Sequence, residues 1–376
     1  MKVVVTGARG LLGRHAATRL HARNCAARFR KTAEPFVLAA LDRAAFGDAN
    51  ALARAVENAD VILHFAGVNR GTETEVAEGN PAIASALADA CRIAAVRPHI
   101  VYANSTHADG DTPYGRSKHR AGEILSRATD RYSDLVLPHI YGEGARPDYN
   151  NVTATFIDRI VRGGEPAVTP GGRVHLLYAG EAAQIAIDAG EQGLTDRIAP
   201  PGRQTEVENL LERLRGFHAD YSTNLFPNLT DPFDLTLFNT YRAALYPDGF
   251  PRPLKLNADA RGVLFEASRG GGGGQTFLSW THPGVTRGDH FHLGKVERFL
   301  VLEGEATIRI RRVLDDTVWS FHVSGETPAA VDMPTLHTHS IENTGDRPLL
   351  TLFWTNEIFD PAAPDTYADP VLASAT

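Results

Sequence analysis

The chain opens with the stretch that constrains its fold most, an apolar run that passes directly into a glycine-rich turn. Residues 2–20 read KVVVTGARGLLGRHAATRL, with glycines at positions 7, 10 and 13. Gly7 permits a tight turn, Gly10 lets the backbone approach a pyrophosphate, and Gly13 lets helix and strand pack closely. A strand, a glycine turn and a helix in this order predict a dinucleotide-binding unit; the alternative is a glycine-rich turn without a ligand.

Two sequence patterns divide the chain. Up to about residue 190, short β-branched runs such as DVILHFAG and HIVYANS alternate with alanine-rich helical stretches, which is typical of an α/β fold with a doubly wound parallel sheet. From about Leu254, short strands alternate with glycine and proline turns and predict an all-β barrel or sandwich. We expect one domain over residues 1–245, including a helical connector, and a second over residues 250–369. The glycine run at 269–275 is interpreted as a loop of the second domain, because no helix follows it.

Charge and cysteine content exclude several classes of protein. The net charge of -7 offers no broad basic surface, so nucleic acid is not expected as a partner. Cys25 and Cys91 are far apart and form no Cys-x-x-Cys motif, which favours a reducing compartment. No signal-peptide pattern and no apolar run of about eighteen residues is present, so we expect a cytoplasmic protein without membrane insertion.

The cofactor is expected to be NADPH. The second strand is predicted to end in ARFRKT, residues 27–32, where Arg30 and Lys31 stand in the place of the acidic residue that favours NAD. Such a cationic pair suits a 2′-phosphate; the alternative is a solvated basic turn. The predicted cofactor-binding residues lie at the ends of the first three strands and on the following helices: Thr6, Gly7, Gly10, Leu11, Leu12, Gly13, Arg30, Lys31, His64, Ala66, Gly67 and Lys118.

A candidate catalytic set follows in the segment DTPYGRSKHRAGEIL, residues 111–125. Pro113 predicts a helix start, and Tyr114 and Lys118, four residues apart, share one face of that helix. An ammonium and an oxidised nicotinamide would favour the phenolate and bring the phenol nearer to working range for proton exchange with a sugar carbonyl. Ser105, at the end of HIVYANS, can donate a hydrogen bond to the same carbonyl. Alone, a tyrosine and a lysine at this spacing would be ordinary surface residues.

Together these motifs resemble the extended short-chain dehydrogenase/reductases. TGARGLLG, HFAG, the strand-end serine and YGRSK carry the resemblance, which covers roughly the first 240 residues. It implies a Rossmann fold with catalytic roles for Ser105, Tyr114 and Lys118, and many members of the family act on nucleotide sugars.

Two histidine pairs stand out in the second half of the chain. His290 and His292 are two residues apart in GDHFH, Glu297 follows, and His337 and His339 lie in DMPTLHTHSIEN. Residues i and i+2 of a strand share a face, so each pair can converge. Imidazoles with one carboxylate suit zinc, iron or manganese better than calcium. The alternative is that these are polar residues on exposed strand faces.

The spacing resembles the two signature motifs of the cupins. The resemblance implies a cupin barrel in which His290, His292, Glu297 and His339 bind a divalent metal, with zinc expected and His337 as a neighbour or alternate. Leu336 stands where a turn glycine is usual in the family, so the loop before His339 is expected to differ in shape.

Nearly end to end, the chain resembles the bifunctional capsular-polysaccharide enzymes of the CapF family. HFAGVNR, PYGRSK, ARPDYNNVTATF, ADARGVLFE, GDHFH, HSIENTGD and FDPAAPDTY carry this resemblance. It implies a zinc cupin that epimerises C3 of a UDP-2-acetamido-2,6-dideoxy-4-hexulose, a reductase domain that reduces C4 with NADPH, and a homodimer through the cupin.

Three departures from the family leave the 2-substituent and the base of the nucleotide sugar open: Val136 where arginine is expected, His139 where asparagine is usual, and YAGEAA at residues 178–183. Two other functions also stay open, a reductase with a structural, dimer-forming cupin and a non-enzymatic module that senses NADP and a sugar. The base for C3 is not selected by spacing; Lys295, His337 and Glu342 are the nearby candidates.

Overall fold

A computed structural model describes residues 1–260 and 262–372. The chain forms two compact units. The first comprises Met1–Phe156 and Pro166–Leu210, and the second comprises Ile157–Glu165 and Leu211–Thr376.

A parallel sheet of six strands forms the centre of the first unit, as predicted. Its order is β2-β1-β3-β4-β5-β8, and every neighbouring pair is parallel. The order reverses between β1 and β3, which is the position where open α/β sheets bind ligands. The strands are β1 Lys2–Thr6, β2 Val37–Leu41, β3 Val61–His64, β4 His99–Ser105, β5 Tyr132–Leu137 and β8 Arg197–Ile198.

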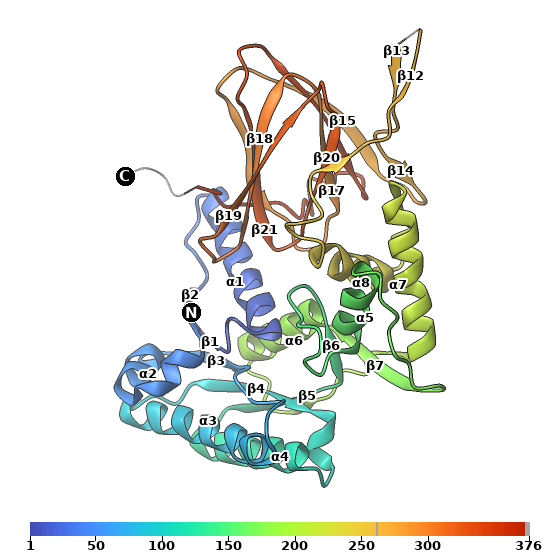
Figure 1. Cartoon of the computed structure of the whole chain (residues 1–376). Helices are drawn as coiled ribbons and strands as arrows, with labels where there is room; N and C mark the ends of the chain where they lie inside the picture. The colour runs from blue at the N-terminus through green and yellow to red at the C-terminus, as the bar shows by residue number, and fades with distance from the viewer. Residues whose placement is uncertain (261, 373–376) are drawn as a thin grey trace. The chain divides into compact units, whose positions relative to one another are not determined.

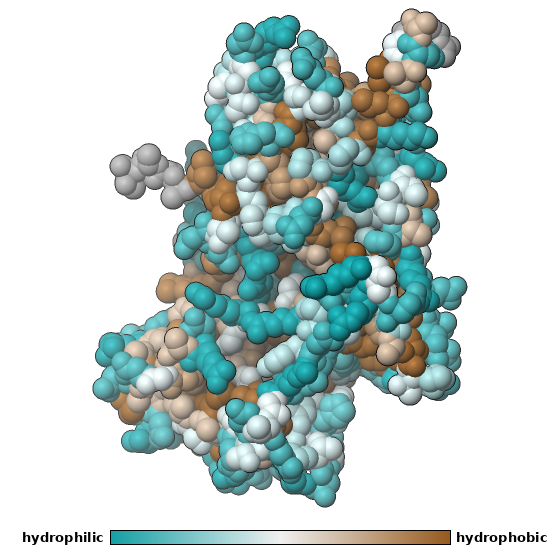
Figure 2. Space-filling view, in the orientation of Figure 1, coloured by the Kyte–Doolittle hydropathy of each residue, from teal (hydrophilic) through white to brown (hydrophobic). Residues whose placement is uncertain are grey.

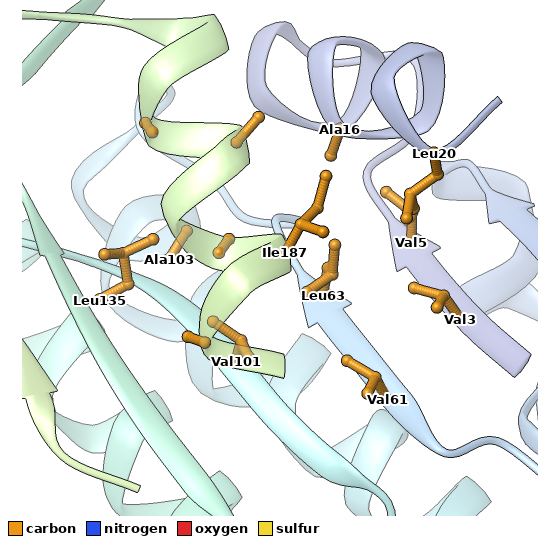
Figure 3. Close-up of a cluster of buried hydrophobic side chains, with 14 of the residues drawn as sticks. Val3, Val5, Ala16, Leu20, Val61, Leu63, Val101, Ala103, Leu135 and Ile187 are labelled. Atoms are coloured by element: carbon orange, nitrogen blue, oxygen red, sulfur yellow. The ribbon is translucent and has the colours of Figure 1, made fainter. Parts of the chain in front are cut away.

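Helices cover both faces of this sheet (Figure 1). Helices α1 (Leu11–Phe29) and α6 (Ala179–Gln192) lie on one face, and α2 (Ala49–Val56), α3 (Glu73–Ile93) and α4 (Pro113–Ala128) lie on the other. Because helices cover both faces of the sheet, strand residues that point to either face are apolar. This explains the near-continuous hydrophobic runs of the sequence. Figure 3 shows the α1 and α6 side of this core, where the residues labelled are Val3, Val5, Ala16, Leu20, Val61, Leu63, Val101, Ala103, Leu135 and Ile187.

Shorter elements complete the first unit. The 3₁₀ helices η1 (Arg43–Gly47) and η2 (Thr106–Asp109) follow β2 and β4, and β6 (His139–Tyr141), β7 (Arg173–Tyr178) and β9 (Arg203–Glu206) form a second, three-stranded sheet. The chain passes from one unit to the other within helix α5 (Val152–Val161), between Glu165 and Pro166, and within helix α7 (Val207–Ser222).

Antiparallel strands dominate the second unit, in agreement with the predicted all-β domain. One sheet has the order β11-β20-β17-β22-β15 and another has the order β19-β18-β21-β16-β23. Their strands are β11 Arg252–Pro253, β15 Gln275–Thr281, β16 Thr286–Phe291, β17 Glu297–Glu303, β18 Glu305–Arg312, β19 Val318–Ser324, β20 Ala329–Met333, β21 His337–Asn343, β22 Leu349–Thr355 and β23 Tyr367–Ala368. Two small pairs, β10 (Leu225–Phe226) with β14 (Arg269–Gly270) and the hairpin of β12 (Asn257–Asp259) with β13 (Gly262–Leu264), add to these sheets.

The connector packs with the second unit, so the compact units divide at residue 210 and not near residue 245 as the sequence predicted. Helix α8 (Pro232–Ala243) and the end of α7 place Tyr221 and Phe238 in edge-to-face contact at 5.4 Å. The Tyr221 hydroxyl donates to buried Asp332 of β20, which also accepts from Arg298 of β17 at 2.5 and 2.8 Å. Since Tyr221, Asp332 and Arg298 are buried together, α8 and the end of α7 pack against the sheet that contains β17 and β20.

The described surface is mixed in polarity. In Figure 2, hydrophilic residues cover most of the visible face, and hydrophobic ones gather in small patches, one of them beside the β12–β13 hairpin. Among residues 1–260 and 262–372, no helix combines the length and the apolar character needed to cross a membrane.

Candidate cofactor and metal sites

The glycine turn between β1 and α1 has a geometry that requires glycine. Gly7 has a φ of +65°, and a Cβ on Gly13 would lie 2.2 Å from the carbonyl oxygen of Gly7. Gly10 is the N-cap residue of α1, and no side chain caps this helix start. The first amides of a helix have no partner within the helix, so those of Leu11, Leu12 and Gly13 can receive a phosphate.

The ends of β1 and β3 are joined beside this turn. The Thr6 hydroxyl lies 2.9 Å from Nδ1 of His64 and accepts a hydrogen bond from the Ala66 amide at 3.2 Å. Burial, followed by the charge of Lys118, lowers the pKa of His64 to about 3, so its ring is neutral near pH 7. These contacts and the following Gly67 line the sheet edge where a dinucleotide is expected.

Arg30 and Lys31 do not lie at the end of the second strand, so that prediction is wrong. Helix α1 continues to Phe29, Arg30 is its C-cap residue, and β2 begins only at Val37. A helix of 19 residues rises roughly 28 Å. Both basic residues are exposed at the end of α1 that is remote from the glycine turn, too far to contact a cofactor there.

β2 ends instead at Leu41, next to the glycine turn. The amide of Ala8 donates to the carbonyl oxygen of Leu41 at 3.0 Å. Asp42 follows, and its carboxylate lies 3.4 Å from Nε of Arg9, a residue of the glycine turn. Arg43 comes next in the chain. The end of β2 thus carries an acidic residue, Asp42, in the place that favours NAD, with Arg9 paired to it and Arg43 next in the chain as the nearby cations.

The structure places the three predicted catalytic residues around the start of α4. Thr112 caps this helix by accepting from the Gly115 amide, Pro113 is its first residue, and Tyr114 and Lys118 are one turn apart, as predicted. Ser105 is the last residue of β4, and its hydroxyl accepts from the His107 amide at 3.2 Å and is near enough to the Tyr114 phenol to influence its pKa. This arrangement can present a phenol and a hydroxyl to one carbonyl oxygen.

Burial shifts the pKa of both titratable groups of this set. It raises the pKa of Tyr114, and the neighbouring Ser105 hydroxyl opposes the change. Burial lowers the pKa of Lys118 to about 7, and the Asp134 carboxylate opposes it. Nζ of Lys118 donates to the carbonyl oxygen of Ala103 at 2.6 Å, a contact that holds the ammonium against β4.

In the second unit, the four predicted metal ligands come together. The ligand atoms of His290, His292, Glu297 and His339 all lie within 4.8 Å of one another. His290 and His339 are opposite each other on β16 and β21, His292 follows β16, and Glu297 begins β17 of the other sheet. All except His290 are buried.

Hydrogen bonds fix the outer nitrogens of two of these rings. Nδ1 of His292 lies 2.5 Å from the carbonyl oxygen of Asp365, and Nδ1 of His339 lies 3.3 Å from that of His337. A carbonyl oxygen only accepts, so Nδ1 carries the hydrogen and the neutral ring presents a lone pair at Nε2. Metal-binding histidines typically make such a hydrogen bond with the ring nitrogen that does not bind the metal.

The inner nitrogens face a carboxylate. Nε2 of His292 and Nε2 of His339 each lie 3.1 Å from Oε2 of Glu297. Burial, followed by the nearby His339 and His292, lowers the pKa of His290 to about 3, so its ring is neutral near pH 7, whereas Glu297 raises the pKa of His292 against the effect of burial. Lone pairs of two nitrogens and an oxygen at this distance repel unless a cation or a shared proton lies among them. The four residues therefore fit a divalent metal.

Asp365 was missed as part of this site. Its carboxylate accepts hydrogen bonds from the amides of Leu293, Gly294 and Lys295 at 2.9, 2.9 and 2.8 Å. The loop that it holds joins His292 to Glu297 and therefore sets their separation. The motif FDPAAPDTY was visible in the sequence, but nothing in it showed which loop it contacts.

The three candidates for the base that would remove the C3 proton have different surroundings in the structure. Glu342 forms an ion pair with Arg309 at 2.6 Å. It is three residues after His339 on β21, so the two side chains point to opposite faces of the strand, and Glu342 faces away from the predicted ligands. Lys295 is buried and donates to the carbonyl oxygen of Pro364 at 2.7 Å, and the His337 ring stacks on Trp319 with centroids 5.6 Å apart.

The turn before the second histidine pair keeps the backbone of a glycine. Leu336 has a φ of +61°, in the left-handed region, and its amide donates to the carbonyl oxygen of His292 at 2.9 Å. Tertiary contacts therefore hold this leucine in a backbone conformation that favours glycine, and the expectation of a different loop shape stays a prediction.

Two protein-family models match the chain. The model described as the NAD dependent epimerase/dehydratase family matches residues 3–197, and the model described as the polysaccharide biosynthesis C-terminal domain matches residues 257–367. Each match falls within one of the two domains expected from the sequence.

Relatives match over the full length. The chain is 31% identical to a UDP-2-acetamido-2,6-beta-L-arabino-hexul-4-ose reductase from Pseudomonas aeruginosa, with 98% of each chain covered. A crystal structure of the capsular polysaccharide assembling protein CapF from Staphylococcus aureus is 31% identical with a TM-score of 0.59, and the match covers 99% of this chain and 100% of that one. The chain is a CapF-like member of the NAD-dependent epimerase/dehydratase family. A structure of CapF with the inhibitor 3-isopropenyl-tropolone also matches this CapF-like chain, with 28% identity and a TM-score of 0.51.

Proposed function

We propose that this CapF-like chain is a bifunctional nucleotide-sugar enzyme of polysaccharide biosynthesis. Its second unit epimerises C3 of a UDP-2-acetamido-2,6-dideoxy-4-hexulose with the help of a metal, and its first unit reduces the C4 ketone with NADPH. The relative from Pseudomonas aeruginosa, a reductase of a UDP-linked 4-ketosugar by name, supports this class of substrate. The order is chemically consistent, since the 4-keto group acidifies the C3 proton and its reduction prevents further epimerisation.

The convergence of three imidazoles on one buried carboxylate is the observation that carries the epimerase half of the proposal. His290, His292, Glu297 and His339 would hold the metal, and zinc suits this donor set. When bound, the metal supplies a Lewis acid that polarises the C4 carbonyl and so lowers the pKa of the C3 proton. The hydrogen bonds from His292 and His339 to backbone carbonyls orient their rings for this role.

The reductase half depends on Tyr114, Ser105 and Lys118. Tyr114 donates its proton to the C4 oxygen while NADPH supplies the hydride to C4, so the ketone becomes an alcohol and the phenol a phenolate. Ser105 donates a hydrogen bond to the same oxygen and positions it. Lys118 binds the nicotinamide ribose and stabilises the phenolate until solvent returns its proton.

A tropolone carries two adjacent oxygens, an arrangement that chelates divalent metals. The inhibitor 3-isopropenyl-tropolone in a CapF structure is therefore a useful probe for this chain. Under the proposal, the zinc-loaded chain binds it and the chain stripped of metal does not.

The proposed function is tested by incubating the zinc-loaded full chain with NADPH and the UDP-linked 4-ketosugar. NADPH fluorescence follows reduction, and NMR of the product reports the configuration at C3. We expect NADPH to be consumed and the product to be inverted at C3. If the ketone is reduced without inversion at C3, the second unit is a structural module and not an epimerase. If no NADPH is consumed, the proposed reductase activity is wrong.

Preference for NADPH is expected to depend on Arg9 and Arg43 instead of Arg30. Arg9→Ala and Arg43→Ala should each weaken NADPH more than NADH, because charged hydrogen bonds to a 2′-phosphate contribute about 1.5 to 3 kcal/mol. This corresponds to roughly a ten- to hundred-fold rise in the Kd for NADPH, measured by fluorescence titration. Arg30→Ala is the matched control and should leave both affinities unchanged. Equal affinities of the parent for NADPH and NADH would refute the preference.

A homodimer through the second unit is also proposed. β15 is at the edge of its sheet, and Phe277, Leu278 and Trp280 on this strand are exposed. An exposed apolar edge is the kind of surface that a second chain covers. Light scattering should give twice the mass of one chain, and Trp280→Asp should shift the population towards single chains; a parent that is monomeric at all concentrations would contradict the proposal.

A further inference from the structure

A carboxylate lies on the sheet face that α4 covers. Asp134 of β5 is paired in parallel register with Tyr102 of β4, so the two side chains share the face towards this helix. Asp134 Oδ1 accepts from Asn104 Nδ2 at 2.8 Å and from the Tyr132 hydroxyl at 3.1 Å. A partly buried carboxylate is unfavourable on a face that is otherwise apolar, so its presence there calls for an explanation.

Helix α4 has a gap at this carboxylate. Gly122 lies one turn after Lys118, and a Cβ at Gly122 would stand 3.0 Å from the Tyr132 hydroxyl and 3.7 Å from Asn104 Nδ2. Because Gly122 has no side chain, the polar cluster of Asp134, Asn104 and Tyr132 can lie directly against the helix that carries Tyr114 and Lys118.

The cluster reaches Ser105 through Asn104. Asn104 donates to Asp134 with its amide nitrogen and accepts with its amide oxygen from the backbone amide of Ser105 at 2.9 Å. Because both ends of the Asn104 amide are engaged, its orientation is fixed, and the backbone that carries the Ser105 hydroxyl is fixed with it.

The cluster also faces Lys118. Nζ of Lys118 lies 4.1 Å from the centre of the Tyr102 ring, and the charge of Asp134 favours the protonated lysine against the larger effect of burial. The titratable groups that pack around Lys118 or Asp134 are His64 of β3, Tyr102 of β4, Tyr132 of β5, Tyr114 of α4 and Arg197 of β8. Asp134 is the acidic residue among these groups.

We propose that Asp134 is a positioning residue of the reductase site, which keeps Lys118 in its ammonium form and, through Asn104, fixes the backbone of Ser105. This inference rests on the proposed function, since it assumes that Tyr114 and Lys118 act on the ketone. Asp134 itself contacts neither substrate nor cofactor in this role.

The sign of the pH effect follows from the charge. Lys118 is a cation below its pKa, and removing the negative charge of Asp134 lowers that pKa further. In Asp134→Asn, the decline of kcat on the alkaline side should therefore move to lower pH, by roughly one pH unit for a charge this close. Turnover at a pH on this limb should fall about ten-fold, whereas turnover well below the limb should change little.

Three variants separate this role from a purely structural one. Asp134→Asn keeps the shape and an acceptor oxygen, Asp134→Glu keeps the charge, and Tyr132→Phe removes a hydrogen bond of the same cluster without changing the charge of Asp134. The readout is the pH profile of kcat for NADPH oxidation with the UDP-linked 4-ketosugar. We expect the alkaline limb to move in Asp134→Asn and to stay near that of the parent in Asp134→Glu and Tyr132→Phe.

The outcomes distinguish this inference from the proposed function. A limb that is unmoved in a folded Asp134→Asn protein, or that moves equally in Tyr132→Phe, would overturn the role of Asp134. Should Tyr114→Phe and Lys118→Ala both reduce the ketosugar at the parent rate, the proposed reductase chemistry would fail first. Thermal unfolding of each variant identifies any that is not folded; should Asp134→Asn not fold, Asp134→Ser, which also removes the charge, supplies the same test.

Discussion

Tyr114→Phe is expected to abolish reduction of the ketone while leaving NADPH binding nearly intact. The phenol is proposed to supply the proton to the C4 oxygen, and a phenyl ring cannot replace it. General acid catalysis contributes about 10²- to 10⁴-fold, so kcat should fall by at least that range. The measurement pairs steady-state NADPH oxidation with the Kd for NADPH from fluorescence titration.

Lys118→Ala provides the comparison, because it should damage both binding and turnover. Its ammonium is proposed to bind the nicotinamide ribose as well as to stabilise the phenolate. A Tyr114→Phe protein that turns over at the parent rate would remove the tyrosine from the mechanism. Loss of NADPH binding in that variant would instead assign the phenol to cofactor binding.

His290→Ala and His339→Ala are expected to remove the metal and with it the epimerase activity. Loss of one of four ligands leaves an open site, and the remaining imidazoles cannot supply a Lewis acid. Elemental analysis should find about one zinc per chain in the parent and far less in each variant. His322→Ala is the matched control, since His322 is an exposed histidine on β19 whose ring hydrogen-bonds Thr307.

The same variants should still reduce a ketosugar that already has the inverted configuration at C3. The reductase residues lie in the first unit, and the metal ligands lie in the second. Full metal content in His290→Ala would show that the four residues are not the ligand set, and normal metal content with lost activity in His322→Ala would weaken the assignment.

Local patterns allowed much of both sites to be predicted from the sequence. The turn with Gly7, Gly10 and Gly13 is defined by residues that are adjacent in the chain, and so is the helix that carries Tyr114 and Lys118. The histidine pairs could be grouped because strand periodicity and motif spacing both placed them together. In each case the motif spans few residues and lies within one turn, helix or strand.

The position of the second strand could not be predicted in the same way. The segment ARFRKT has no strong stop signal, and the structure continues α1 to Phe29 because buried alanines and Leu20 pack this helix on the sheet. Tertiary packing therefore placed Arg30 at a helix end and left Asp42 and Arg43 at the end of β2, with Arg9 beside Asp42.

Contacts between distant segments were also invisible. Asp365 lies 70 residues beyond Lys295 in the loop that it holds between His292 and Glu297, and Asp134 contacts Asn104 only because β4 and β5 are neighbours in the sheet. The connector helices likewise join the second unit through Tyr221 and the buried Asp332. None of these pairings has a motif, since each depends on which elements the fold brings together.

Exchange of the C3 proton tests the central claim, that two separate sites divide the chemistry, most directly. The UDP-linked 4-ketosugar is incubated in D2O, without NADPH, with the zinc-loaded parent, Tyr114→Phe or His290→Ala, and proton NMR follows the C3 signal. We expect the signal to disappear at the parent rate with Tyr114→Phe and to persist with His290→Ala. Exchange at the parent rate with His290→Ala, or its loss with Tyr114→Phe, would contradict it.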